Sequence, residues 1–110
     1  MSTKSSTEWP DPTIAAGDVC TLLLENDRVR VFDVRFRPGQ KAVMHRHPDH
    51  VVYVLADFTA NMTVPGESGQ VIPLKAGQAV WIGAGPHEVQ NIGTTEGHAL
   101  VVELKEGRKN

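Results

Sequence analysis

The sequence predicts an all-β domain, folded as a sandwich or a barrel, and three observations lead to this expectation. Short runs rich in β-branched residues recur along the chain, and several of them alternate between two faces with a period of two. Segments rich in glycine, proline and asparagine separate these runs and are typical of turns. No long apolar pattern at helical spacing occurs between them, which argues against alternating helices and strands.

Eight or nine short strands are expected, and they follow one another closely. The run 28–36 shows the alternation well, because Phe32, Val34 and Phe36 share one face while Val31 and Asp33 share the other. Turn-forming sequences at 37–40, 64–69, 74–78, 83–86 and 91–97 end several of the runs. In chain order the candidate strands are residues 20–26, 28–36, 41–47, 50–58, 59–64, 69–74, 78–82, 87–93 and 98–105.

The two ends of the chain differ in composition from the part between them. Residues 1–13 are rich in serine and threonine and end in a Pro-Asp-Pro turn, which predicts a flexible N-terminal arm. Residues 106–110 are mostly charged and are expected to form a frayed tail. A single β-barrel domain is therefore predicted for residues 14–105.

Composition and charge exclude several classes of function. The chain has 110 residues with a formal charge of −2, which provides no basic surface for nucleic acid and no polybasic face for an anionic membrane. No apolar run approaches the roughly 20 residues that span a bilayer, and the first dozen residues lack a signal-peptide pattern. Cys20 is the only cysteine and is expected to be a small buried apolar residue. We expect a cytoplasmic protein.

Histidines are concentrated in one short stretch, residues 45–50, which reads HRHPDH and holds three of the five in the chain. Alternation along a strand places His45 and His47 on the same face, and His50 opens the next run close to them. His87 follows a glycine-rich turn and is the fourth candidate. Imidazoles brought together from two hairpins would bind a divalent first-row transition metal, namely Fe, Ni, Zn, Mn or Cu. The alternative, ordinary polar histidines that never bind a metal, stays open.

Two segments, 39–56 and 77–91, resemble the two conserved motifs of the cupin superfamily. The position at which cupins usually carry a glutamate ligand is occupied here by His50, in a connecting loop that is one residue shorter. The resemblance implies a double-stranded β-helix, or jelly-roll barrel, with a metal held by His45, His47 and His87 and with His50 as a fourth ligand. It also implies a homodimer. The matching positions are Gly39, His45, His47, Gly77, Gly85, His87 and Asn91.

An all-imidazole ligand set would leave a divalent ion its full charge, which favours small anionic substrates that chelate the metal. We therefore expect an oxidoreductase, a dioxygenase in particular, that acts on such a small molecule. A non-oxidative isomerase or lyase at the same site, and a barrel that binds a metal or small ligand without catalysis, are the alternatives. No catalytic side chain can be assigned, since Tyr53 and Glu88 should point away from the histidines. Arg35, Arg37 and Gln40 are candidates to meet an anion at the mouth of the barrel, and the alternative, which is commoner for arginine, is that they are ordinary surface residues.

Overall fold

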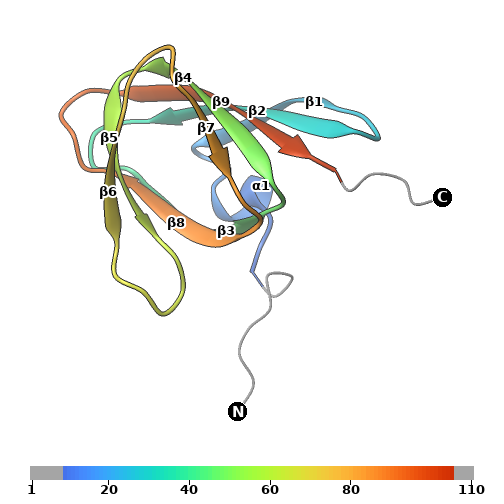
Figure 1. Ribbon diagram of the computed structural model, residues 1–110, viewed down its shortest axis with the longest axis horizontal. Helices are drawn as coiled ribbons and strands as arrows, with labels where there is room; N and C mark the ends of the chain where they lie inside the picture. The colour runs from blue at the N-terminus through green and yellow to red at the C-terminus, as the bar shows by residue number, and fades with distance from the viewer. Residues whose placement is uncertain (1–8, 106–110) are drawn as a thin grey trace.

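The computed structural model describes residues 9–105 (Figure 1). The predicted tail at 106–110 and the first eight residues of the predicted arm lie outside the described residues. The described part contains one short helix, α1 (Pro12–Ala15), and nine strands, which confirms the all-β prediction. The strands are β1 (Cys20–Glu25), β2 (Val29–Phe36), β3 (Lys41–His47), β4 (His50–Ala56), β5 (Phe58–Thr63), β6 (Gln70–Leu74), β7 (Ala79–Ile82), β8 (Gly85–Asn91) and β9 (Gly97–Leu104).

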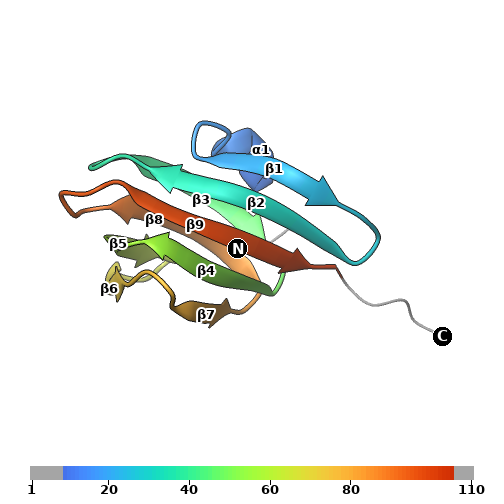
Figure 2. The same ribbon diagram turned by 90° about the horizontal axis from the view of Figure 1, so that it is seen from above.

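The strands form two antiparallel sheets that face each other (Figure 1). The five-stranded sheet has the order β1-β2-β9-β4-β7, and the four-stranded sheet has the order β3-β8-β5-β6. Figure 2 looks onto the five-stranded sheet and shows β9, the last strand of the chain, lying between β2 and β4. Because β3 and β4 follow each other in sequence but belong to different sheets, the 45–50 stretch crosses from one sheet to the other.

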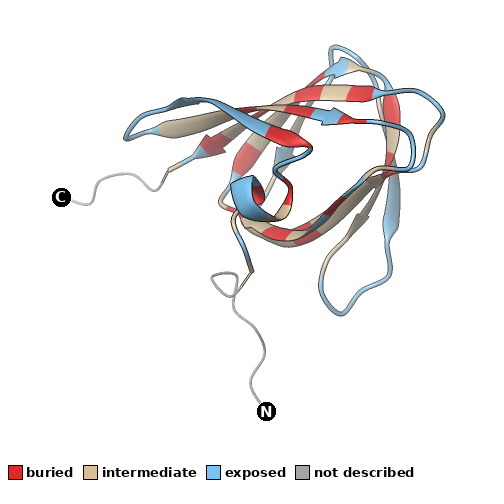
Figure 3. Ribbon diagram, turned by 180° about the vertical axis from the view of Figure 1, so that it is seen from behind, coloured by how far each residue is buried: buried red, intermediate tan, exposed pale blue. Residues whose placement is uncertain are grey.

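The core lies between the two sheets, as the period-two pattern predicted. On β2 the side chains of Phe32, Val34 and Phe36 are buried, whereas Arg35 is exposed. Figure 3 shows the same alternation of buried and less buried positions along other strands. Gly39 and Gly77 have φ values of 83° and 90°, so both turns use the left-handed conformation that glycine adopts most easily.

Helix α1 begins inside the segment that the sequence predicted to be an arm. Asp11 caps the helix, because its carboxylate accepts a hydrogen bond from the Thr13 backbone N–H at 3.1 Å. The buried residues Ala16 and Val19 that follow the helix join the core. The Arg46 N–H of β3 donates to the Pro10 carbonyl, which ties the preceding segment to the four-stranded sheet. Among the described residues no helix is long and apolar enough to cross a bilayer.

Candidate metal centre

Three buried histidines of the four-stranded sheet converge inside the barrel. His45 and His47 are two residues apart on β3, and His45 is the direct cross-strand partner of His87 on β8. Their ring centroids are 4.8 to 5.0 Å apart, and one ligand nitrogen from each lies within 4.8 Å of the other two. This spacing allows a single metal ion to be shared by the three side chains.

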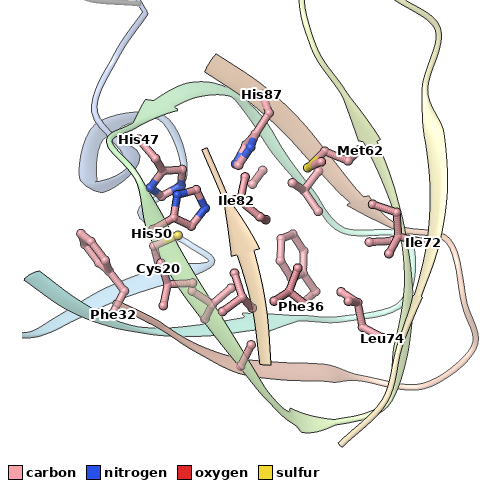
Figure 4. Close-up of a pocket in the computed structure, with 18 of the residues that line it drawn as sticks. Cys20, Phe32, Phe36, His47, His50, Met62, Ile72, Leu74, Ile82 and His87 are labelled. Atoms are coloured by element: carbon pink, nitrogen blue, oxygen red, sulfur yellow. The ribbon is translucent and has the colours of Figure 1, made fainter. Parts of the chain in front are cut away.

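The fourth predicted histidine, His50, enters from the opposite sheet. It is the first residue of β4, only 1% exposed, and its ring centroid is 4.3 Å from that of His47 and 5.8 Å from that of His87. Figure 4 shows the rings of His47, His50 and His87 gathered on one side of the cavity. His50 is therefore adjacent to the three-histidine group, although it is not a member of the set whose ligand atoms lie within 4.8 Å.

The hydrogen bonds of these rings determine which nitrogen is free. The Nδ1 atom of His45 lies 2.6 Å from the Val43 carbonyl, and that of His50 lies 2.9 Å from the Pro48 carbonyl. A carbonyl oxygen only accepts, so each Nδ1 carries the proton and donates it. The Nε2 atom is then left with its lone pair, which is the state a metal ligand requires.

Burial keeps the histidines neutral. It is the largest cause of the lowered pKa of His45, His50 and His87, and it lowers the pKa of His47 to about 2. The neighbouring imidazoles add to the lowering at His47, because a second positive charge nearby would be repelled. At neutral pH all four rings therefore offer lone pairs rather than protons to a cation.

A buried carboxylate, Glu103 of β9, lies directly behind the cluster, and sequence reasoning missed it. Glu103 is 2% exposed, and its Oε2 lies 2.5 Å from the Nδ1 of His47. Its Oε1 accepts from the Nε of Arg30 at 2.9 Å, and Arg30 in turn contacts Asp11 at 2.7 Å. Burial raises the pKa of Glu103, while the hydrogen bond and charge of Arg30 act in the opposite direction. The alternation on β9 was a usable signal, because Glu103 continues the inward face of Val101.

A cavity of about 360 Å³ opens from the histidines into the barrel. Apart from the histidines and Cys20, its described lining is glycine and apolar side chains, including Phe36, Phe58 and Leu74. Figure 4 shows Ile72 and Leu74 across the cavity from the His47 and His50 rings. Burial raises the pKa of Cys20 to about 12, so its thiol is neutral, and the prediction that it is a small buried residue is confirmed.

The remaining candidates lie elsewhere. Arg35 pairs with Asp33 on the outer face, Arg37 is exposed and Gln40 bonds to Asp18. None of the three lines the cavity, in agreement with the surface alternative for these residues.

The predictions that Tyr53 and Glu88 point away from the histidines are confirmed. Tyr53 is 43% exposed, and the Glu88 carboxylate lies 3.2 Å from the Lys41 ammonium. Their positions follow from strand alternation, since each is next to an inward-facing residue on its own strand.

Comparison with known proteins agrees with the fold. The chain is 38% identical over 89 residues to the β-alanine degradation protein BauB of Pseudomonas aeruginosa, covering 79% of this chain and 93% of that protein. A cupin-domain protein of Bordetella pertussis shares 30% identity and a TM-score of 0.74, covering 80% of this chain and 93% of that one. An RmlC-like double-stranded β-helix protein of Methanocaldococcus jannaschii has a TM-score of 0.66 at 16% identity, covering 79% of each chain. A scan against protein-family profiles finds no match.

Proposed function

The chain belongs to the cupin superfamily, and from this premise we propose that it is a metal-dependent oxygenase acting on a small anionic, chelating substrate. One observation carries the proposal. Three neutral imidazoles with converging nitrogens lie at the wall of an otherwise largely apolar cavity, and a fourth, His50, lies beside them.

We propose His45, His47 and His87 as the metal ligands, with His50 as the fourth. Their donor set fits a first-row divalent ion, because imidazole nitrogen suits Fe, Ni, Zn and Cu and can also hold Mn. When bound, such an ion would polarise a chelating oxygen and, in the case of iron, supply the redox chemistry that dioxygen requires.

The chain's own contribution is to hold, orient and dehydrate the reactants. No lysine or arginine lines the described cavity, so the anionic end of a substrate has only the metal to bind. Its remaining atoms would pack against apolar side chains such as Phe36, Phe58 and Leu74. These walls keep water away from the reacting atoms, which protects reactive species from side reactions. A compact chelator with an uncharged, apolar body fits these requirements best.

The cavity favours oxygenation over the non-oxidative alternatives. Isomerisation or lyase chemistry needs a side chain that moves a proton at the substrate. Among the described lining residues only the histidines and the neutral Cys20 thiol could do so, and the histidines are assigned to the metal. The name of the BauB relative connects that protein with the degradation of β-alanine, a small molecule that carries a carboxylate.

We also propose that the protein is a homodimer, that it acts in the cytoplasm and that its partners are small molecules rather than nucleic acid. The formal charge of −2 supports the last point.

Elemental analysis and oxygen uptake test the proposed function. The purified protein should contain one first-row metal per chain, and a His45→Ala/His87→Ala double variant should contain none. After reconstitution with Fe²⁺, the wild-type protein should consume dioxygen with a 2-oxo acid or β-diketone that carries a short alkyl arm.

Three results would contradict this function. Purified wild-type protein that contains no metal would contradict the proposed metal centre. Turnover that persists without oxygen, and with Zn²⁺ in place of Fe²⁺, would establish the isomerase or lyase alternative. Tight metal binding with no turnover of any such compound would establish a binding protein.

A further inference from the structure

We infer that Glu103 supplies, from outside the ligand set, the negative charge that a glutamate ligand would otherwise bring to this metal centre. The inference rests on the proposed metal site. It concerns a positioning residue, since Glu103 acts on the ion through His47.

The contacts of Glu103 are specific to one ligand. Its Oε2 accepts the Nδ1 proton of His47, whereas the Nδ1 protons of His45 and His50 go to backbone carbonyls. A carboxylate is a stronger acceptor than a carbonyl, so it fixes the ring orientation of His47 and makes its Nε2 a stronger donor to a metal. His47 is therefore distinguished from its neighbours.

The sheet register holds Glu103 in this place. Arg30 of β2 and His50 of β4 are its two cross-strand partners, so the three side chains form one inward-facing row. The guanidinium of Arg30 engages the other carboxylate oxygen, Oε1. A buried carboxylate that is bonded on both oxygens has little freedom to turn away from His47.

The connected side chains of Asp11, Arg30 and Glu103 carry a net negative charge. Arg30 bridges two carboxylates, those of Asp11 and Glu103, at 2.7 and 2.9 Å. Two carboxylates and one guanidinium carry one net negative charge. With a divalent ion the whole assembly then carries one net positive charge, the same as a site with three histidines and one glutamate ligand. The replacement of the usual glutamate by His50 thus need not make the centre more positive.

A purely structural ion pair between Glu103 and Arg30 is the alternative. It would stabilise the fold in the absence of metal but would not change the metal affinity or the electronic structure of a bound ion. These two roles can be separated with Co²⁺, whose visible absorption reports on its ligands.

The test is a Co²⁺ titration of metal-free wild-type protein and of Glu103→Gln, which keeps the shape of the side chain but removes its charge. We expect the variant to bind Co²⁺ about 10- to 100-fold more weakly and to show a shifted absorption band. Glu88→Gln is the matched control, because Glu88 adjoins His87 in sequence but pairs with Lys41 outside the barrel. Its titration should match that of the wild type.

A second variant keeps the test decisive if Glu103→Gln does not fold. Asp11 is partly exposed and farther along the same chain of contacts, so Asp11→Asn should weaken Co²⁺ binding by roughly two- to fivefold without moving the band. Unchanged affinity and spectrum in folded Glu103→Gln would overturn the inference, and if only Asp11→Asn folds, unchanged Co²⁺ affinity in that variant would overturn it. Wild-type protein that binds no Co²⁺ would instead overturn the metal centre itself.

Discussion

At the scale of single residues, the histidines of the site are buried polar groups that stay neutral, and His45, His47 and His50 have hydrogen-bond partners. Their rings are 1–7% exposed, and the apolar surroundings that keep them neutral would also resist protonation. Backbone carbonyls or a carboxylate accept the Nδ1 protons of His45, His47 and His50, so these donors are not left unsatisfied. The site is preorganised for a cation, and without one it should be sensitive to acid.

We expect metal-free protein to lose stability at an increasing rate as the pH falls below about 7. The pKa values of the four histidines are lowered in the folded protein and return to about 6.5 on unfolding. Below pH 6.5 the unfolded chain therefore binds more protons, and each histidine removes up to about 1.4 kcal/mol of unfolding free energy per pH unit. Glu103 acts in the opposite direction, since its pKa is raised, but it is one group against four.

Urea denaturation at several pH values measures this effect. Saturation with Zn²⁺ should raise the unfolding free energy at each pH without removing the pH dependence, because the protons responsible for that dependence are bound by the unfolded chain. A His50→Gln variant should show a shallower slope than the wild type. A midpoint that stays constant between pH 8 and 5 in metal-free protein would show that these rings are not neutral in the folded state.

The residues of the site were only partly predictable. His45, His47 and His50 lie within six positions, so strand alternation was enough to group them, whereas His87 joined the prediction through its glycine-rich turn and the family resemblance. Glu103 is separated from His47 by 56 positions and from Arg30 by 73. Only the register of β9 against β2 and β4 connects them, and a single sequence contains no record of that register.

At the scale of elements, β9 links the core and the site. It lies between β2 and β4, its inner face carries Ala99, Val101 and Glu103, and it begins at Gly97. The ring of Phe58 lies against Gly97 and stacks on Phe36 with centroids 5.7 Å apart. A side chain at Gly97 would overlap this ring, so the glycine makes room for the aromatic pair.

Gly97→Ala should therefore lower the unfolding free energy by roughly 1–3 kcal/mol, because an added methyl group must displace Phe58 from a packed core. Gly83→Ala is the matched control. A Cβ at Gly83 would meet no atom closer than 4.0 Å, so its effect should stay within about 0.5 kcal/mol. Thermal or urea unfolding of both variants tests this, and equal stabilities would show that Phe58 can move without loss.

Most strands were predicted to within a few residues, since period-two alternation and turn residues are local signals. The run 28–36, for example, became β2 (Val29–Phe36). Helix α1 was not predicted, because four residues are too few to show a helical period. The cap at Asp11 and the proline at the first helical position were the available signals. The order of strands within each sheet depends on long-range pairing and was not predicted, since the family resemblance implied only the jelly-roll fold.

At the scale of the whole molecule, the outer face of the five-stranded sheet is apolar along one complete row. Each strand contributes one residue to this row, and the cross-strand partners follow one another in register from β1 to β7. No described element covers the face in Figure 2. The nearby polar side chains are Asp33, Arg35 and His98, and the Asp33 carboxylate contacts both of the others. The row consists of Leu24, Val31, Val102, Val51 and Trp81.

Such a face fits a second copy of the chain, because two apolar rows related by a two-fold axis can bury each other without stranding a charge. The exposed ends of the row, Leu24 at 49% and Trp81 at 58%, would lose the most contact with water. We expect a dimer in light scattering at micromolar concentration, and Val51→Lys should weaken it at least about tenfold by placing a charge at the middle of the interface. Val71→Lys makes the same change at a 60% exposed site on β6 of the other sheet and should leave the dimer intact. A wild-type monomer would disprove the dimer, and equal effects of the two variants would place its interface elsewhere.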